Sequence, residues 1–504
     1  MNGLPDVDGL ALAALVRDRQ VSPLELLDAA MAAVDAVDAT IGAIASLQYD
    51  VASAAIDRGL PDGPFTGVPF LLKDLGCDAV GHPCTQGSRL FADYRSGNND
   101  EMFVRLRRSG LVTFGRTTSP EFGIGPTTES SVYGRPTRNP WDPGHVAGGS
   151  SGGSGAAVAA GIVPMAHGSD GGGSVRIPAA SCGVFGMKPT RARLPDGPNV
   201  GESWAGMAID GFLTRSVRDT AALLDATNGS DLGAPYVAPP LPDSFTNAIT
   251  RPPARLRIVF STRSFTGDAI DPECASAVLR TALLLEELGH EVVEAVADSV
   301  GVPIPVDIRV LMLAWTDIIA CGTALMVRQH EGALGRSATD DDLEVVTRAA
   351  VRHAASVSGA DYLAAVDVVH ASGRAMAHSM TSVDVLLTAT LAEPPAAIGR
   401  FAPSLQSFGH HDFVEYRTGP TGVLSYSPFT ALANATGQPA MSVPMHWTTA
   451  HGTTNSLPVG VHVMGRFGDD LVLMQLATQL EQAAPWWNRR PPCRAPTSAS
   501  VPTS

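Results

Sequence analysis

The chain is 504 residues long, is 44% hydrophobic and carries a formal net charge of −15. The acidic balance argues against nucleic acid and anionic membranes as partners, because both bind basic surfaces. The six cysteines have no C-x-x-C spacing, and the sequence shows neither a secretory signal pattern nor an uncharged apolar stretch that could span a bilayer. We therefore expect a reduced, metal-free protein of the cytoplasm with a large core.

The N-terminal part is predicted to begin with a helix and to continue with mixed elements. Ser22 as N-cap, Pro23 at the first helical position and Glu25 at the third form a capping box, which predicts a helix from Pro23. The apolar residues 64–72 predict a strand. Residues 101–118 predict a helix followed by a strand.

Further along, the pattern alternates between strand and helix. Residues 154–160 predict a short helix of small side chains, and residues 162–166 predict a buried strand. Residues 256–260 predict a strand, residues 272–288 a long helix, and residues 292–293 the start of another strand. This last group is a β-α-β unit. We therefore expect an α/β fold with a large mixed, mostly parallel sheet and helices on both faces.

We find no internal repeat and no linker between two cores, so we expect a single domain over residues 1–488. Within it, a motif-rich core spans about 64–220, and a variable, helix-rich part spans about 235–400. The Pro/Ser/Thr-rich residues 489–504 are expected to form a flexible tail.

Only two lysines occur in the chain, Lys73 and Lys188, whereas the other 33 basic residues are arginines. Lysine, unlike arginine, can lose its proton when buried and can then act as a base. Lys73 ends the apolar run 67–72, and Lys188 follows the apolar run 183–187. The alternative for each is a structural role beside a buried carboxylate. Because both flank a glycine- and serine-rich region, we expect at least one of them to be a base.

Two glycine-rich segments, residues 148–154 and 168–174, lie between the lysines. Glycine lets backbone N–H groups converge on an anion, since no Cβ blocks the approach. Neither segment has the form of a phosphate-binding motif. A tight turn without a bound anion is the plain alternative. We expect instead an oxyanion hole made by consecutive N–H groups of Gly171, Gly172, Gly173 and Ser174.

A second hydrolase pattern is present but weak. Residues 149–153 formally match the G-x-S-x-G elbow of α/β-hydrolases. That elbow directly follows a hydrophobic strand, whereas residues 141–147 have the composition of a loop. We therefore do not expect an α/β-hydrolase.

Together these motifs resemble the amidase signature family. The resemblance is strongest over residues 110–190 and weak over residues 235–400. The motifs that carry it are Gly67-Val68-Pro69, Lys73-Asp74, Gly115-Arg116-Thr117-Thr118, Arg138-Asn139-Pro140-Trp141-Asp142, both glycine-rich segments, Arg176-Ile177-Pro178-Ala179, Lys188-Pro189-Thr190, Gly437-Gln438-Pro439-Ala440 and Pro458-Val459-Gly460.

The resemblance implies a catalytic triad of a serine, a second serine after a cis peptide, and a lysine. Carried over by motif, Ser174 is the nucleophile, Ser150 the bridging serine and Lys73 the base. The chemistry is consistent with this, because serine needs an adjacent base and burial disfavours the lysine ammonium. Asp170 is expected to orient the oxyanion loop, with an ordinary Asx turn as the equal alternative. No metal or cofactor is required.

Other residues are assigned packing or pairing roles. Lys188 is expected to be structural, and His145 and His167 are expected to be packing histidines. The sequence His410-His411-Asp412 suggests a metal site, but an ordinary role without metal is favoured for these residues because no H-E-x-x-H motif is present.

The resemblance implies an amidase that acts on a small, largely apolar carboxamide, linear or cyclic. Its pocket residues are expected within residues 300–430. Trp315 and Cys321 could line a pocket there, but packing in the core is the favoured interpretation for both. The competing function is the A-type subunit of a glutamine amidotransferase, which works in a complex. Such subunits typically carry Asp where this chain has Ser427. The family resemblance also suggests a homodimer.

Overall fold

A single large sheet lies at the centre of the molecule. The computed structural model describes residues 3–295, 304–402, 412–449 and 456–498. The strands in this part of the chain are β1 (Ile44–Leu47), β2 (Pro69–Lys73), β3 (Val112–Thr117), β4 (Met165–Asp170), β5 (Phe185–Lys188), β6 (Ile209–Thr214), β7 (Arg257–Phe260), β8 (Glu291–Glu294), β9 (Val385–Ala389), β10 (Ala440–Trp447) and β11 (Pro458–Gly465). Their spatial order is β1-β3-β2-β4-β6-β5-β10-β11-β9-β7-β8.

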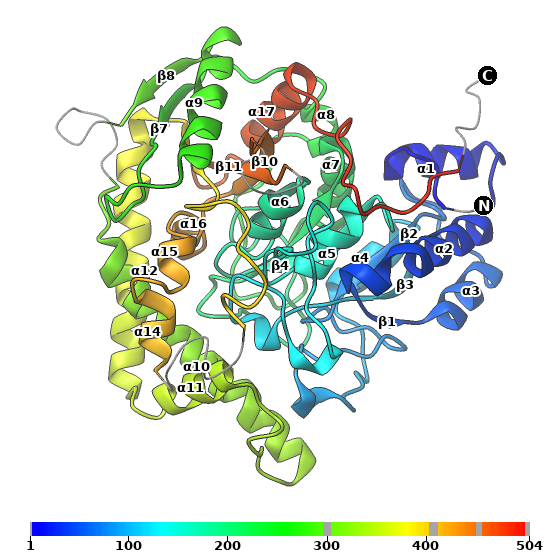
Figure 1. Cartoon of the computed structure of the whole chain (residues 1–504), viewed down its shortest axis with the longest axis horizontal. Helices are drawn as coiled ribbons and strands as arrows, with labels where there is room; N and C mark the ends of the chain where they lie inside the picture. Colours follow the sequence, from blue (N-terminus) through cyan, green and yellow to red (C-terminus); the bar gives the residue numbers. More distant parts are fainter. Residues whose placement is uncertain (1–2, 296–303, 403–411, 450–455, 499–504) are drawn as a thin grey trace.

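Helices surround this sheet (Figure 1). Those of the first half are α1 (Gly9–Arg17), α2 (Pro23–Ile41), α3 (Tyr49–Asp57), α4 (Glu101–Arg108), α5 (Gly152–Ala159), α6 (Arg176–Cys182), α7 (Val217–Thr227), α8 (Phe245–Ala248) and α9 (Pro272–Glu287). Those of the second half are α10 (Ile308–Leu334), α11 (Val345–Ala354), α12 (Gly359–Ser379), α14 (Phe413–Thr418), α15 (Val423–Tyr426), α16 (Thr430–Thr436) and α17 (Asp470–Ala483). Short 3₁₀ helices are η1 (Arg89–Phe91), η2 (Glu121–Gly123), η3 (Ser131–Tyr133) and η4 (Met380–Ser382).

The sheet is mixed, as predicted, but antiparallel pairing predominates. Parallel pairs join β2 to β3 and β4, and β7 to β8 and β9. The other six neighbouring pairs of described strands are antiparallel. The predicted β-α-β unit exists as β7-α9-β8, but the predicted parallel majority is wrong. Local patterns indicate strands, whereas the direction in which distant strands pair is decided by the tertiary fold.

Helices cover both faces of the sheet, as strand β11 illustrates. A Cβ atom added to Gly460 would lie 2.7 Å from Cβ of Ala180 in α6. A Cβ atom added to Gly465 would lie 3.1 Å from Cγ of Leu473 in α17. Residues 460 and 465 differ in parity, so they point to opposite faces of the strand. The sheet is therefore buried between two layers of helices.

Most predicted elements lie close to their predicted positions. Ser22 caps α2, since its Oγ accepts from Glu25 N at 3.2 Å and the Glu25 carboxylate accepts from Ser22 N at 2.8 Å. The strand predicted at residues 162–166 instead begins at Met165 and extends to Asp170. Its last residues are polar, so the apolar pattern did not indicate them, but they pair with β6.

Helix α10 is long and apolar enough to cross a membrane by length and composition. It packs against α11, α12 and α14, and its side chains Trp315, Ile318 and Ile319 belong to a buried hydrophobic cluster with those helices. Asp317 interrupts the apolar sequence. A core helix can also have this length and composition, and the packing of α10 is that of a core helix.

The C-terminal segment is packed where a flexible tail is predicted. After α17 the chain runs back to α1 (red in Figure 1). Cys493 N donates to Pro140 O at 3.1 Å, and Ala495 is buried. This corrects the prediction for residues 489–498, because a Pro/Ser/Thr-rich composition does not prevent backbone groups from bonding to a neighbouring surface. Residues 499–504 lie outside the described residues.

Candidate active site

Two parallel strands bring the first candidate residues together. Strands β2 and β4 are neighbours, with Leu71 paired to Ala166, so their carboxyl ends lie at the same edge of the sheet. Lys73 is the last residue of β2, and Asp170 is the last residue of β4. The glycine-rich segment that follows Asp170 therefore begins beside Lys73.

Lys73 is completely buried, and its amine lies among oxygen atoms. Nζ is 2.6 Å from Ser150 Oγ, 2.9 Å from Ser169 Oγ and 3.4 Å from Ser169 O. Burial lowers the pKa of Lys73 to about 7, although the charge of Asp170 acts in the opposite direction. A neutral amine has one lone pair, so it can accept the Ser150 proton while it donates to Ser169. Lys73 thus lies within hydrogen-bond distance of a hydroxyl and can lose its proton near neutral pH.

The segment that carries Ser150 lies against the segment that carries Ser174. Ser151 N donates to Ser174 O at 3.0 Å. The Gly149–Ser150 peptide is cis, as the resemblance implies. Position 149 requires glycine, because a Cβ atom there would lie 2.6 Å from Thr127 N.

Two short helices begin at this place. Helix α5 begins at Gly152, directly after the first glycine-rich loop, and α6 begins at Arg176, directly after the second. Helix N-terminal ends carry a partial positive charge. That charge disfavours an ammonium on Lys73 and favours an oxyanion beside Ser174.

Ser174 is half-buried, and its hydroxyl has no hydrogen-bond partner within the described residues. It is therefore open to an incoming carbonyl group. The Ser150 hydroxyl already contacts Lys73, so a proton relay requires the Ser174 side chain to turn toward Ser150. Catalytic hydrogen bonds often form only when substrate is bound.

Asp170 holds the backbone of the second loop. Its Oδ1 accepts from Gly173 N at 2.8 Å, and its Oδ2 accepts from Val175 N at 3.0 Å. Arg176 Nη2 lies 2.8 Å from Oδ1, and Asn434 Nδ2 donates to Oδ1 at 2.9 Å. Burial raises the pKa of Asp170, but the charge of Arg176 and the hydrogen bonds from Arg176, Asn434 and Val175 together outweigh burial and hold that pKa well below its usual range. These are the contacts of a residue that orients the loop.

One of the four predicted oxyanion donors is not available. The Gly173 N–H is bonded to Asp170, and Gly173 turns the chain at a φ of 128°. The N–H groups of Gly171, Gly172 and Ser174 have no partner within the described part of the chain. The prediction from sequence is corrected to these three donors, because only the folded loop shows which N–H the Asp170 carboxylate takes.

Two tryptophans lie against the oxyanion loop. A Cβ atom on Gly172 would overlap Cη2 of Trp315, and one on Gly171 would lie 2.5 Å from Trp204 Cζ3. Trp315 is a buried residue of α10 and belongs to the hydrophobic cluster of that helix, which agrees with the expected core packing, and its ring also lies against the loop. Trp204 was not predicted, since nothing in its local sequence distinguishes it from a packing residue.

The other predicted residues have local partners. Lys188 Nζ donates to Pro189 O at 2.8 Å, which agrees with a structural role. His167 Nδ1 accepts from Lys73 N at 3.3 Å and so joins β4 to β2. His145 Nδ1 lies 3.4 Å from Asp142.

The described residues contain no group of three or more His, Cys, Asp or Glu side chains that could hold a metal ion. Of the suspected set at residues 410–412, His410 and His411 lie outside the described residues. Asp412 caps α14, since its carboxylate accepts from Val414 N at 2.8 Å.

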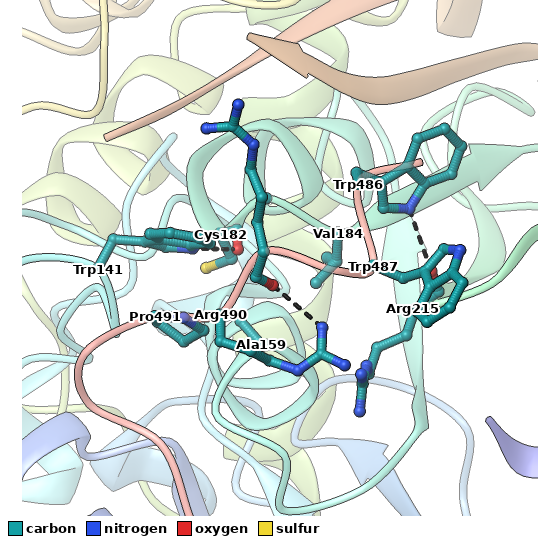
Figure 2. A pocket seen from close by; sticks show the side chains of 11 residues that line it. Trp141, Ala159, Cys182, Val184, Arg215, Trp486, Trp487, Arg490 and Pro491 are labelled. Atoms are coloured by element: carbon teal, nitrogen blue, oxygen red, sulfur yellow. Dashed lines mark hydrogen bonds between the residues drawn. The ribbon is translucent and has the colours of Figure 1, made fainter. Parts of the chain in front are cut away.

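A separate cavity lies at the far end of α6 (Figure 2). It is lined by Trp141, Cys182, Arg215 and Arg490 among others, and its volume of about 20 Å³ has room for one water molecule. Cys182 is the last residue of α6, whereas Ser174 precedes the first. The cavity is therefore not the place where Ser174 would meet a substrate.

The chain is similar to known proteins over nearly its full length. A family model described as Amidase matches residues 25–474. A 6-aminohexanoate-cyclic-dimer hydrolase from Pseudomonas sp. (strain NK87) is 37% identical over 99% of this chain and 98% of its own length. The structure of a 6-aminohexanoate cyclic dimer hydrolase complexed with substrate superposes with a TM-score of 0.89 at 35% identity, covering 97% of this chain and 99% of the other. A glutamyl-tRNA(Gln) amidotransferase subunit from Thermotoga maritima superposes less well, with a TM-score of 0.72 at 26% identity over 98% of this chain and 100% of the other.

Proposed function

Because this chain belongs to the amidase signature family and is an amide hydrolase, we propose that it cleaves a carboxylic amide through an acyl-enzyme on Ser174. In this proposal Ser150 relays the proton and Lys73 is the base. One observation carries it: a buried amine with a pKa of about 7 lies 2.6 Å from Ser150 Oγ. A lysine in that state can accept a proton near neutral pH, whereas an ordinary surface lysine cannot.

The first step forms the bond between Ser174 Oγ and the amide carbon. Ser150 Oγ takes the Ser174 proton and passes its own proton to Lys73 Nζ. The carbonyl oxygen becomes an oxyanion, which accepts hydrogen bonds from the N–H groups of Gly171, Gly172 and Ser174.

The second step breaks the C–N bond. Lys73 returns the proton through Ser150 to the amide nitrogen, so the amine leaves as a neutral molecule. Water then loses a proton to the same relay and attacks the acyl carbon, which releases the carboxylic acid and restores Ser174. The sequence of steps needs neither a metal nor a cofactor.

The substrate is proposed to be a small, largely apolar carboxamide. The names of the similar hydrolases support a cyclic or linear amide of this kind. The tryptophans Trp204 and Trp315 would provide apolar walls for it. A cytoplasmic location and a homodimer remain predictions.

A role within a glutamine amidotransferase has less support. The position in question, Ser427, is buried near the glycine loop: its Oγ lies 2.8 Å from Thr430 Oγ1, which donates to Gly172 O at 2.6 Å. A serine there has no negative charge to hold the amine of glutamine. Copurification with further subunits would favour this alternative.

The test is a hydrolysis screen of aliphatic, aryl and cyclic amides, including the cyclic dimer of 6-aminohexanoate. The released amine is measured for the wild-type chain and for Ser174→Ala. We expect turnover of at least one class, a loss of about 10³-fold or more in Ser174→Ala, and an acyl group on the Ser174 peptide after acid quenching. Undiminished turnover in Ser174→Ala, or an acyl group on another residue, removes Ser174 as the nucleophile.

A further inference from the structure

Arg417, on α14, is a buried arginine with no acidic partner among the described residues. Its exposed fraction is 3%, and its Nε and Nη2 atoms have no hydrogen-bond partner in the same part of the chain. Burial lowers the pKa of Arg417 to about 10, so the guanidinium still carries its charge at neutral pH. The undescribed stretch before α14, residues 403–411, contains neither Asp nor Glu in its sequence.

The other described arginines that stack on aromatic rings differ from Arg417. Arg400 lies over Phe401, with 5.0 Å from its Cζ to the ring centre, but it is also paired with Glu393 at 2.5 Å. Arg489 lies over Trp447 and is exposed to solvent. Each of these two arginines therefore has either a carboxylate or water for its charge.

One line of contacts joins Arg417 to the oxyanion loop. Its Cζ lies 4.2 Å from the centre of the Trp315 ring. The far edge of that ring faces Gly172, where an added Cβ would overlap Cη2. Trp315 Nε1 is itself buried without a partner among the described residues.

A second line of contacts reaches the other glycine-rich segment. The neighbour of Arg417, Tyr416, has its hydroxyl 2.7 Å from a Cβ atom built on Gly125. A Cβ atom on Gly123 would lie 3.4 Å from Ser150 Oγ. Arg417 is thus one side chain away from the oxyanion loop, through Trp315, and its neighbour Tyr416 lies against the turn 123–125 that is beside Ser150.

We infer that Arg417 binds a carboxylate carried by the amide substrate. An unpaired buried cation is strongly unfavourable, and a ligand of opposite charge relieves it. The guanidinium fork matches the two oxygens of a carboxylate, whereas a neutral carbonyl satisfies an N–H without balancing the charge. The inference rests on the proposed function and narrows its substrate to amides that bear a free carboxylate on the acyl or the amine side.

Matched substrates test this in the full chain. For the acyl side they are the mono-p-nitroanilide of adipic acid and the analogue with a methyl ketone in place of the carboxylate. For the amine side they are N-hexanoyl-6-aminohexanoate and its methyl ketone analogue. In each pair the ratio of kcat/KM, charged over neutral, measures recognition of the carboxylate.

We expect a ratio of roughly tenfold or more for one pair in the wild-type chain, since hydrogen bonds to a charged group are worth about that factor. In Arg417→Met the ratio falls toward one, mainly through KM. In Arg417→Lys we expect part of the charged-to-neutral ratio of kcat/KM to remain. The control Arg400→Met, which removes a stacked arginine that has its own carboxylate, keeps the wild-type ratio.

A binding measurement separates recognition from turnover. In Ser174→Ala, hexanoate and the neutral hexanamide are titrated by calorimetry and by tryptophan fluorescence, since Trp315 contacts Arg417. We expect hexanoate to bind roughly tenfold or more tightly than hexanamide, and this preference to disappear when Arg417→Met is added.

Equal binding of hexanoate and hexanamide, or a charged-to-neutral ratio of kcat/KM near one in the wild-type chain, overturns the inference. The proposed function still stands in that case if neutral amides are hydrolysed. Conversely, Arg417-dependent binding of hexanoate without hydrolysis of any amide supports the carboxylate site and overturns the proposed function. If Arg417→Met does not fold, Arg417→Lys takes its place, and a preference for hexanoate that is undiminished in Arg417→Lys overturns the assignment to Arg417.

Discussion

Lys73 and Lys188 have similar surroundings but different partners. Both are buried, and burial lowers the pKa of each to about 7. Lys73 Nζ contacts the Ser150 hydroxyl at 2.6 Å, whereas Lys188 Nζ donates to the carbonyl of Pro189 at 2.8 Å. A carbonyl has no proton to give, so this geometry favours Lys73 over Lys188 as the proposed base. Lys188 is therefore a natural control for Lys73.

The first prediction concerns charge at position 73. Lys73→Arg keeps a cation but cannot be deprotonated, so we expect it to lose activity about as severely as Lys73→Ala, on the order of 10³-fold in kcat. Steady-state kinetics on any amide found in the screen measures this. Substantial turnover in Lys73→Arg would exclude Lys73 as the base.

The second prediction concerns pH. The active form of Lys73 is the neutral amine, which is present above its pKa of about 7. We expect kcat/KM to rise about tenfold per pH unit below that value and to level off above it. Lys188→Met should keep the same profile, because Lys188 contacts no residue of the triad in the described structure. A flat profile between pH 6 and 8, or its loss in Lys188→Met, contradicts the assignment.

At the scale of elements, helix α10 has two functions. Its buried side chains pack against α11, α12 and α14, and Trp315 on the same helix forms a wall beside Gly172. The helix contains Gly322, which faces Trp204, and Gly332, which is exposed with open space around it. A side chain at position 322 would therefore collide with Trp204, whereas a side chain at position 332 would meet no neighbour.

The third prediction compares these glycines. Gly332→Ala should raise the free energy of unfolding by about 0.5–1 kcal/mol, because alanine favours the helix and meets no neighbour. Gly322→Ala should lower it by roughly 1–2 kcal/mol and reduce activity, because its Cβ would lie 2.8 Å from Trp204 Cδ1. Urea unfolding and amide hydrolysis measure both variants. Equal effects of the two substitutions would contradict close packing of Trp204 on α10.

At the scale of the whole molecule, the site is assembled from segments far apart in the chain. Strand β2 provides Lys73, the two glycine loops provide both serines, α10 provides Trp315, and α14 provides Arg417. One sheet of eleven described strands holds these parts in place. The C-terminal segment packs against the same part of the molecule, since Ala495 N donates to Ala160 O at 2.8 Å, just after the end of α5.

The fourth prediction concerns that segment. A chain that ends at Asn488 loses the bonds of Cys493 and Ala495 and the pair between Arg490 and Asp6, which is 2.9 Å long. Compared with a chain that ends at Ser498, we expect its free energy of unfolding to fall by roughly 2–4 kcal/mol. Thermal unfolding measures the difference. Identical melting temperatures would mean that residues 489–498 do not contribute to stability.

Several features could be predicted from the sequence because they are local. The cap of α2 and the unit β7-α9-β8 follow from patterns within a few turns of chain. The glycine loops indicated the active-site region for the same reason, since glycine is required where backbones come close: a Cβ atom on Gly149 would lie 2.6 Å from Thr127 N. The parallel majority was a wrong prediction, because pairing direction depends on strands that are distant in sequence.

The amino-acid sequence is enough to identify groups that are able to do chemistry, because Lys73, Ser150 and Ser174 belong to short motifs and their residue types set their reactivity. The surroundings of those groups depend on the fold. It lowers the pKa of Lys73 by burial, assigns the Gly173 N–H to Asp170 and leaves the Arg417 charge without a partner among the described residues. Solvation and hydrogen bonding of a buried group depend on neighbours brought from elsewhere in the chain, so a local sequence pattern cannot predict them.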